Sequence, residues 1–522
     1  MTFRLISLLC LVTLAGNAQP NRTNEQPAQA KYWILLDGKD QATAPSLSPK
    51  ALAQRQLQNI PVDDTDRPLS KAYLNQLKQV GVQPVCQSRW LNAVSARLSP
   101  AQYSVVASMP FVKEIKAIDP AIVITAINRT DDPDAAKLQL APVMTQIQAN
   151  DFAQAGLTGR FVTIGVIDAG FFGADSANAL KHVFARDGVK RVRDYVNEKK
   201  THSNLFRTLE TFSDTHGTEV LAAIAGSDPT DNIQYGLATD ATFYLARTDQ
   251  GNREYRGEED NWVAAMEWMD SLGVKLINTS LGYAKGMSNP KENYEPGQMD
   301  GHTSLISRAA QIAADKKGIL IIVSAGNEGD DRSWRIISTP ADAQGVLAIG
   351  ATNNKVWNRI GYSSIGPESL PYLKPNVSCF SLYGTSLSAP VITGFAACLM
   401  QANPKLTNKQ LMDIIEKSSH LYPYGNNYVG YGVPQASRAL ALLRNETLPA
   451  NARSIKATGK TLTLPVSTGD QVVSVFHKKD ATHVLQQESA KVNAGKLTLR
   501  RENNERQTTV DLKKEVIEVI WE

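Results

Sequence analysis

Three polar side chains with complementary chemistry stand at the edges of apolar runs in the middle of this sequence. Asp168 ends the run in "VTIGVIDAGF", His216 precedes the run in "SDTHGTEVLAAIAG", and Ser386 lies in "YGTSLSAPVITG". A serine hydroxyl is a poor nucleophile until a base takes its proton, and the base needs a carboxylate that fixes its tautomer and stabilises the imidazolium. An acid, an imidazole and a hydroxyl that converge would therefore suit nucleophilic catalysis.

Ser386 on its own also has a simpler interpretation as the entry to a helix. Serine hydroxyls satisfy the unpaired N–H groups of a first helical turn, and a proline such as Pro390 is tolerated there. The same placement leaves backbone N–H groups facing the site. The N–H of Ser386 would then help to hold an oxyanion.

A fourth segment, "IIVSAGNEG", offers a second oxyanion donor. Asn327 follows the end of an apolar strand between Gly326 and Gly329, which permit close backbone approaches. A side-chain amide aimed at developing negative charge contributes about 2.7–4 kcal/mol in such sites. A lone Gly-Asn pair is more often a turn, so the inference depends on all four segments together. Asp214 is expected to be a loop or capping acid.

The four segments lie in a stretch, residues 141–446, where apolar strands alternate with helical patterns. Continuous apolar runs such as "GILIIVSAGN" and "GVLAIGATN" are separated by amphipathic segments such as "SLISRAAQIAADKKG". This alternation predicts an α/β domain whose parallel sheet has helices on both faces. Ligand sites of such sheets lie at the carboxyl ends of the strands, where Asp168 and Asn327 are expected.

Smaller units flank this domain. Residues 30–120 mix strand and helix patterns and predict an α+β unit with helices on one face of an antiparallel sheet. Residues 121–140 are charged and predict a linker. Residues 447–522 alternate apolar and polar side chains with period two and predict a small antiparallel β module of unassigned role.

The first 18 residues have the pattern of a secretory signal peptide. Arg4 precedes an apolar stretch from Leu5 to Leu14, and small residues follow up to Ala18. The protein is therefore expected to be secreted, to the periplasm or the extracellular space. No later segment reaches about 18 uninterrupted apolar residues, so no membrane span is predicted.

Composition narrows the choice of partners. The 522 residues include 55 Lys and Arg against 51 Asp and Glu, a net charge of +4 without long basic blocks. Nucleic acid is therefore not an expected partner. Of the four cysteines, Cys10 lies in the signal segment and Cys86 in the first unit. Cys379 and Cys398 either pair or remain buried thiols, and the sequence leaves both alternatives open.

The order Asp168, His216, Asn327, Ser386, with "DAG", "HGT", "SAGNEG" and "GTSLSAP" around these residues, resembles the subtilisin-like serine proteases, the subtilases of peptidase family S8. The resemblance covers about residues 147–443. It implies that Asp168 orients the imidazole, His216 is general base and then general acid, Ser386 is the nucleophile and Asn327 is the oxyanion donor. Subtilisin is itself a known example of this chain order.

The resemblance also implies two segments that contact substrate. One is an extended edge that pairs with the substrate backbone: Ser280, Leu281 and Gly282. The other is the opposite wall of the primary specificity pocket: Ser324, Ala325 and Gly326. The pocket is expected to be small or uncharged and to favour apolar side chains, while the residue preference at the cut is left open.

The first unit resembles the ferredoxin-like inhibitory propeptides of secreted subtilases, which assist folding, occupy the cleft and are then removed. The resemblance therefore implies a secreted serine endopeptidase, made as an autoprocessed zymogen, that acts through an acyl-enzyme. Its expected partners are polypeptide substrates and its own propeptide, and it is expected to be a monomer. No cofactor is required for the chemistry; a structural calcium ion is an open expectation without assigned ligands. The alternative is a catalytically silent binding protein that keeps the same scaffold.

Overall fold

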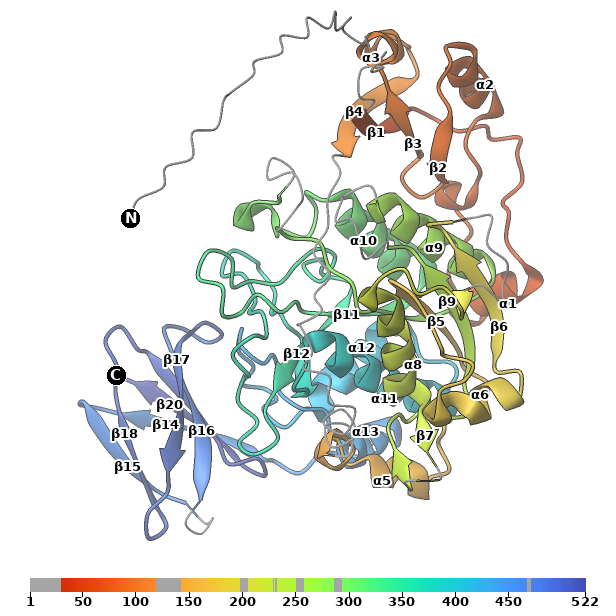
Figure 1. The fold of residues 1–522 in the computed structure, drawn as a ribbon. Helices are drawn as coiled ribbons and strands as arrows, with labels where there is room; N and C mark the ends of the chain where they lie inside the picture. The colour runs from red at the N-terminus through yellow and green to blue at the C-terminus, as the bar shows by residue number, and fades with distance from the viewer. Residues whose placement is uncertain are drawn as a thin grey trace, which may run out of the picture.

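The computed structural model describes residues 30–118, 142–197, 205–228, 230, 232–249, 258–285, 293–466 and 471–522. The predicted signal peptide (1–18) and linker (121–140) lie outside the described residues. Figure 1 shows three units: an N-terminal unit, a large central α/β domain and a C-terminal β module on the opposite side of that domain.

A seven-stranded parallel sheet forms the centre of the large domain. The strand order is β13-β12-β11-β10-β5-β9-β6, and every neighbouring pair is parallel. Most residues of the inner strands are buried on both faces, which confirms the sheet predicted from the continuous apolar runs. The strands are β5 (Thr163–Asp168), β6 (Val189–Asp194), β9 (Thr242–Arg247), β10 (Leu276–Thr279), β11 (Leu320–Ser324), β12 (Leu347–Thr352) and β13 (Val377–Phe380).

Helices cover both faces of this sheet because alternate strand residues point in opposite directions. On one face Ile322 packs in a core with α8, α11, α12 and α13. On the other face Ile321 and Val323 pack in a core with α9 and α10. The helices are α5 (Ala149–Gln154), α6 (Lys181–Ala185), α8 (His216–Ala225), α9 (Glu259–Ser271), α10 (Leu305–Lys317), α11 (Ser388–Ala402), α12 (Asn408–Ser418) and α13 (Ala436–Leu443).

Short elements complete the domain at the ends of these strands and helices. They are η2 (Asn178–Leu180), η3 (Phe212–Thr215), β7 (Ser227–Asp228), β8 (Ile233–Gln234), η6 (Pro296–Gln298) and η7 (Thr385–Leu387). Within the described residues, one helical stretch, Thr385–Ala402, is long and apolar enough to cross a membrane, but 83% of it is buried inside the protein. It is the central core helix of the domain.

The N-terminal unit has a four-stranded antiparallel sheet in the order β2-β3-β1-β4. One face, which includes Ile34 and Val94, packs against Leu77 of α2 and Val106 of α3. The other face, which includes Trp33 and Leu35, joins the core that holds α9 and α10. The elements are β1 (Ala30–Leu36), α1 (Pro49–Leu57), η1 (Asp64–Asp66), α2 (Lys71–Gln79), β2 (Pro84–Ser88), β3 (Ala93–Leu98), α3 (Pro100–Ala107) and β4 (Val112–Ile118). This arrangement confirms the ferredoxin-like expectation.

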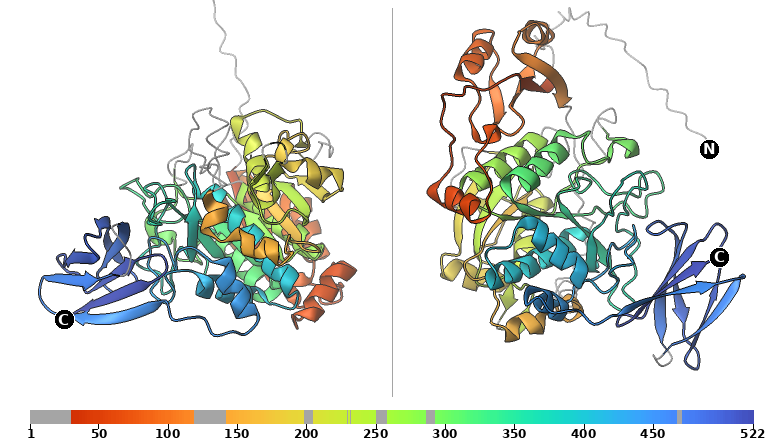
Figure 2. Two further views of the ribbon diagram at one scale, coloured as in Figure 1. Left: turned by 90° about the horizontal axis from the view of Figure 1, so that it is seen from below. Right: turned by 180° about the vertical axis from the view of Figure 1, so that it is seen from behind.

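Helix α1 departs from the prediction that the helices of this unit share one face of its sheet. Its predicted N-cap, Ser48, does accept a hydrogen bond from Ala51 N. The helix leaves the sheet, however, and lies against the central domain, as both views of Figure 2 show. Ser48 N donates to Ser271 O at 2.9 Å, at the end of α9. The sequence pattern identified the helix but not the surface that it covers.

A buried cluster of charges fixes α1 in this place. Arg55, 1% exposed, donates to Asp66 Oδ2 at 2.8 Å and to Asp270 Oδ2 at 2.8 Å. Lys317 Nζ at the end of α10 donates to Asp66 Oδ1 at 2.8 Å. Two cations and two carboxylates, contributed by both units, therefore neutralise one another away from water.

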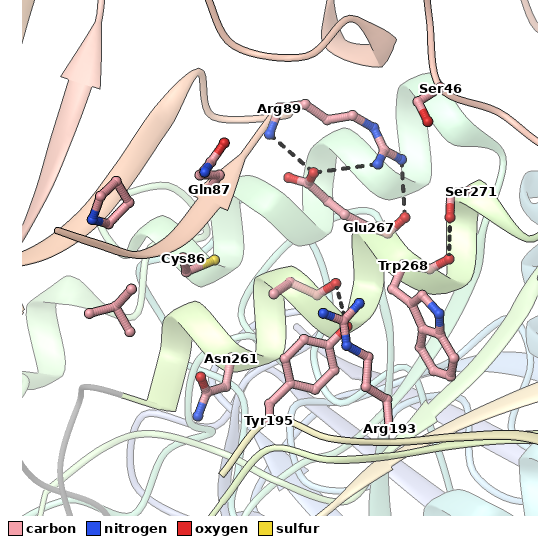
Figure 3. Close-up of a pocket in the computed structure, with 13 residues that line it drawn as sticks. Ser46, Cys86, Gln87, Arg89, Arg193, Tyr195, Asn261, Glu267, Trp268 and Ser271 are labelled. Carbon is pink, nitrogen blue, oxygen red and sulfur yellow. Dashed lines mark hydrogen bonds and ion pairs between the residues drawn. The ribbon is translucent and has the colours of Figure 1, made fainter. Parts of the chain in front are cut away.

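A second contact joins the turn after β2 to α9 (Figure 3). Glu267 Oε1 accepts from Ser88 Oγ at 2.6 Å and from Trp90 N at 3.1 Å. Its Oε2 accepts from Arg89 N at 3.1 Å. Arg89 Nη2 also donates to Asp270 Oδ2 at 2.9 Å. Burial disfavours the charged form of Glu267 and raises its pKa. The hydrogen-bond donors of the N-terminal unit offset part of this cost.

The C-terminal module contains a five-stranded sheet in the order β14-β20-β19-β16-β17 and a two-stranded ribbon, β15-β18. The predicted antiparallel β module is confirmed with one exception, since β14 and β20 are parallel. They are the first and last strands, and the long path between them permits a parallel pair that a hairpin would not. The strands are β14 (Ala452–Ala457), β15 (Thr461–Pro465), β16 (Val472–Lys478), β17 (Val484–Lys491), β18 (Lys496–Arg500), β19 (Gln507–Asp511) and β20 (Val516–Trp521).

We expect Arg55→Ala to lower the free energy of unfolding of the unprocessed chain by about 1.5–3 kcal/mol, because Asp66 and Asp270 each lose one charged donor and keep only Lys317 and Arg89. Lys409→Ala is the control, since Lys409 pairs with Asp315 in solvent and such pairs contribute about 0–1 kcal/mol. Urea unfolding followed by tryptophan fluorescence measures both. Equal losses would contradict an anchoring role for the Arg55 cluster.

Candidate active site

A buried carboxylate and an imidazole meet at the carboxyl end of β5. Asp168, the last residue of β5, is fully buried, and its Oδ1 lies 2.7 Å from Nδ1 of His216, the first residue of α8. Nδ1 is the donor in this bond, so the neutral ring carries no proton on Nε2 and can accept one there. The structure thus brings together the first two predicted residues, in the geometry that an orienting acid and a base need.

Two glycines allow this approach. Gly217 N donates to Gly170 O at 2.9 Å. A Cβ atom on Gly217 would collide with the Gly170 carbonyl and lie 2.9 Å from the Cβ of Asp168. The backbones of the "DAG" and "HGT" segments are therefore in direct contact. Any side chain at position 217 would push α8 away from β5.

Asp214, two residues before His216, holds the turn that leads into α8. Its Oδ2 accepts from Glu210 N at 2.8 Å and from Thr211 N at 2.9 Å. Its Oδ1 lies 2.9 Å from Nη2 of Arg247 at the end of β9. These contacts confirm the interpretation of Asp214 as a capping acid. Sequence reasoning missed Arg247, whose position at the end of an apolar strand was the available signal.

Ser386 lies in η7, immediately before α11, and is 2% exposed. Its Oγ donates to Ser280 O at 3.3 Å, and Ser280 Oγ donates in return to Ser386 O at 2.9 Å. Turn η7 also contacts α8, the helix that begins with His216. The reciprocal serine pair holds Ser386 against the carboxyl end of β10, beside the Asp168 and His216 pair.

The side chain of Asn327 is held in one orientation by Thr385. Asn327 Oδ1 accepts from Thr385 N at 2.8 Å and from Thr385 Oγ1 at 3.0 Å, while Gly326 N donates to Thr385 Oγ1 at 3.1 Å. Because the amide oxygen faces Thr385, the amide nitrogen points the other way. Sequence reasoning did not identify Thr385, although it directly precedes Ser386.

The first predicted substrate-binding segment follows β10, and the second begins at Ser324, the last residue of the adjacent strand β11. After the first segment, Tyr283 N donates to Thr339 O at 2.8 Å. A Cβ on Gly282 would collide with the hydroxyl of Ser338, whose N donates to Ala325 O at 3.3 Å. Ser338 therefore lies between the two segments. The contacts of the six residues with substrate stay predictions.

The described ranges contain few residues that could bind a metal ion or act as a reactive thiol. No group of three or more His, Cys, Asp or Glu side chains there could hold a metal ion, and structural calcium stays an untested expectation. Cys379 and Cys398 are buried free thiols. Burial raises the pKa of Cys398 to about 12 and raises that of Cys379 as well, so both remain protonated near neutral pH.

Comparisons with known proteins agree with this geometry. The family model of the subtilases matches residues 159–432. A second model, the peptidase S8 propeptide domain of Bacteroidota, matches residues 31–135. The two matches fall on the central domain and on the N-terminal unit.

Individual relatives cover the same region. Subtilisin NAT of Bacillus subtilis subsp. natto is 27% identical over 359 residues, which is 66% of this chain and 80% of the relative. Subtilisin DY of Bacillus licheniformis is 28% identical over 285 residues, 52% of this chain and 89% of the relative. Fervidolysin from Fervidobacterium pennivorans, a keratinolytic enzyme related to subtilisin, shares the fold with a TM-score of 0.51 at 17% identity, over 93% of this chain and 71% of its own.

We expect Gly217→Ala to destabilise the domain by about 1–3 kcal/mol through overpacking and to break the hydrogen bond between Asp168 and His216. Gly297→Ala is a matched control, because nothing lies within 4 Å of its added Cβ. Urea unfolding measures the stability, and the downfield proton resonance of His216 Nδ1 reports the hydrogen bond. Retention of that resonance in Gly217→Ala would contradict the assigned close approach.

Proposed function

The chain belongs to the subtilase family, and from this premise we propose that it is a secreted serine endopeptidase that cuts peptide bonds with Asp168, His216 and Ser386. It is a subtilisin-like serine protease that carries its own propeptide. The observation that carries the proposal is the 2.7 Å hydrogen bond between Asp168 and His216, next to the turn that holds Ser386. The predicted signal peptide supports secretion.

The proposed reaction starts with proton transfer from Ser386 Oγ to Nε2 of His216. The oxygen attacks the carbonyl carbon of the scissile bond, and Asp168 stabilises the imidazolium that forms. His216 then gives the proton to the leaving amine as the C–N bond breaks, which leaves an acyl ester on Ser386. A water molecule, deprotonated by His216, attacks this ester, and the proton returns to Ser386 as the acid product departs.

The oxyanion of each tetrahedral intermediate would be held by two donors, Asn327 Nδ2 and the backbone N–H of Ser386. The orientation of Asn327 set by Thr385 supports this role, because a donor that is fixed beforehand needs no reorganisation during the reaction. Each of the four residues predicted from the sequence then has one role. Asp168 orients the imidazole, His216 transfers protons, Ser386 attacks the carbonyl carbon and Asn327 stabilises the oxyanion.

We also propose that the N-terminal unit acts as an intramolecular inhibitor before it is cleaved. Its sheet packs on α9 and α10, and its donors satisfy the buried carboxylates of α9. Lys31 Nζ adds a 2.7 Å ion pair with Asp260 Oδ2, both almost fully buried. Without the unit these acids would face water, so its binding is specific in charge and in shape.

Intact mass and N-terminal sequencing of the wild type beside Ser386→Ala test the nucleophile. We expect the wild type to lose the N-terminal unit by a cut between residues 118 and 142 and the variant to keep it, because only the hydroxyl can start the reaction. Labelling of the processed protein by a serine-directed phosphonate is the second readout. If both proteins fold yet keep the unit and wild type is not labelled, a silent binding protein is the better description.

Asn327→Ala tests the oxyanion donor. We expect kcat on a peptide substrate to fall about 10²–10³-fold, the range known for loss of this kind of donor in subtilisin, with KM little changed. Thr385→Val is the graded control, since it removes one of the two bonds to Asn327 Oδ1 and should cost only about tenfold. An unchanged kcat in Asn327→Ala would remove Asn327 from the mechanism.

A further inference from the structure

One loop lies between the C-terminal module and the segment that carries Asn327. We call residues 353–366, which follow β12, the brace loop. Figure 1 shows the module on the side of the central domain where β12 lies, away from β6. Hydrogen bonds join the brace loop to both neighbours.

The module holds the brace loop through strands β16 and β17. Gln487 pairs with the backbone of Arg359 in both directions: Oε1 accepts from Arg359 N at 3.1 Å, and Nε2 donates to Arg359 O at 2.8 Å. Ser474 Oγ donates to Val356 O at 2.7 Å. The amide of Gln487 therefore acts on Arg359 as a neighbouring strand would.

The side chain of Arg359 folds the brace loop around itself. Its Nη1 donates to Gly361 O at 2.5 Å and to Ser363 O at 2.6 Å. Its guanidinium lies 4.9 Å from the ring centre of Tyr428, a stacking distance for a cation on an aromatic face. Gln487 thus fixes the backbone of the same residue whose side chain shapes the rest of the loop.

The far side of the brace loop fixes the backbone on both sides of Asn327. Ser364 N donates to Gly326 O at 3.1 Å, and Gly329 N donates to Tyr362 O at 2.7 Å. Between them, Glu328 N donates to Ser364 Oγ at 3.1 Å. Glu328 Oε2 accepts from Ser364 Oγ at 3.1 Å and from Asn327 N at 2.8 Å.

Close packing makes this contact stiff. A Cβ on Gly329 would collide with the Ser363 carbonyl and with Nη1 of Arg359. An apolar cluster also crosses the boundary, with Ile365, Leu421 and Val429 of the central domain against Phe476, Val484 and Val516 of the module. The module is therefore packed onto the brace loop rather than tethered to the domain by a linker alone.

We infer that the C-terminal module positions the oxyanion donor, because Gln487 holds Arg359 and the brace loop holds the backbone around Asn327. The inference rests on the proposed peptidase function. Gln487 and Arg359 are positioning residues, since they act on Asn327 through the brace loop. Oxyanion donors must lie within a few tenths of an ångström of their working place, and loops keep such precision only when they are anchored.

Gln487→Ala in the full chain tests the inference, with Gln486→Ala as a matched control on the neighbouring, exposed position of β17. We expect Gln487→Ala to lower kcat about tenfold, the effect of roughly one lost hydrogen bond, with KM unchanged and with faster amide exchange in residues 326–329 and 353–366. Gln487→Glu keeps an acceptor for Arg359 N and should restore part of kcat. Equal kcat values for Gln487→Ala and Gln486→Ala would overturn the inference.

A double-mutant cycle separates positioning from general destabilisation. If Gln487 acts through Asn327, Asn327→Ala combined with Gln487→Ala should be no slower than Asn327→Ala alone; fully additive losses would overturn the inference. A failure of the proposed function looks different. In that case the wild type shows no peptidase activity that depends on Ser386, whereas failure of the inference alone leaves Asn327→Ala and Ser386→Ala impaired and Gln487→Ala normal.

Discussion

The architecture of the site depends on satisfying one fully buried carboxylate, that of Asp168. It stands at the end of β5 without water, so it needs donors from the protein. Ala169 N supplies one at 2.8 Å and His216 Nδ1 another at 2.7 Å. For the imidazole to reach it, α8 must begin against the end of β5, which the glycines at 170 and 217 permit. The same requirement gives the imidazole its tautomer, so one contact satisfies the buried carboxylate and orients the proposed base.

Local patterns predicted much of this molecule, and non-local pairing accounts for what they missed. Continuous apolar runs predicted the parallel strands, and motifs at strand ends and helix starts singled out Asp168, His216, Asn327 and Ser386 as the candidate site residues. The orientation of Asn327 by Thr385 could not be predicted, because it depends on a turn 58 residues away. Two further features were missed for the same reason: the parallel pairing of β14 with β20, and the surface that α1 covers. The periodicity of a segment shows that it has an apolar face to bury, but not which part of the protein covers that face.

The contacts of the central domain with its two neighbours differ in chemistry. The N-terminal unit docks through an apolar sheet face, which includes Trp33 and Leu35, and through buried charges around α9 and α10, such as Arg55 with Asp270. The C-terminal module docks through an apolar cluster and hydrogen bonds. Buried ion pairs add little net stability but specify one partner and one register, whereas apolar packing is strongly stabilising. The buried charges therefore specify where the N-terminal unit docks, while apolar packing stabilises both contacts.

The separation of α1 from the sheet of its own unit makes the N-terminal unit a bivalent ligand. One contact is the turn after β2 on Glu267. The other is α1 on Asp270, together with η1 on Lys317. When either contact dissociates, the other holds the unit against the central domain. The dissociated contact therefore has a high effective concentration and forms again before the unit diffuses away. The N-terminal unit dissociates completely only when both contacts are broken at the same time. Because β1 precedes α1 and stays paired with β3 and β4, one cut between α1 and α2 would not separate the two contacts. A second cut between β1 and α1 would, and slow, cooperative release would then become two fast and independent dissociations.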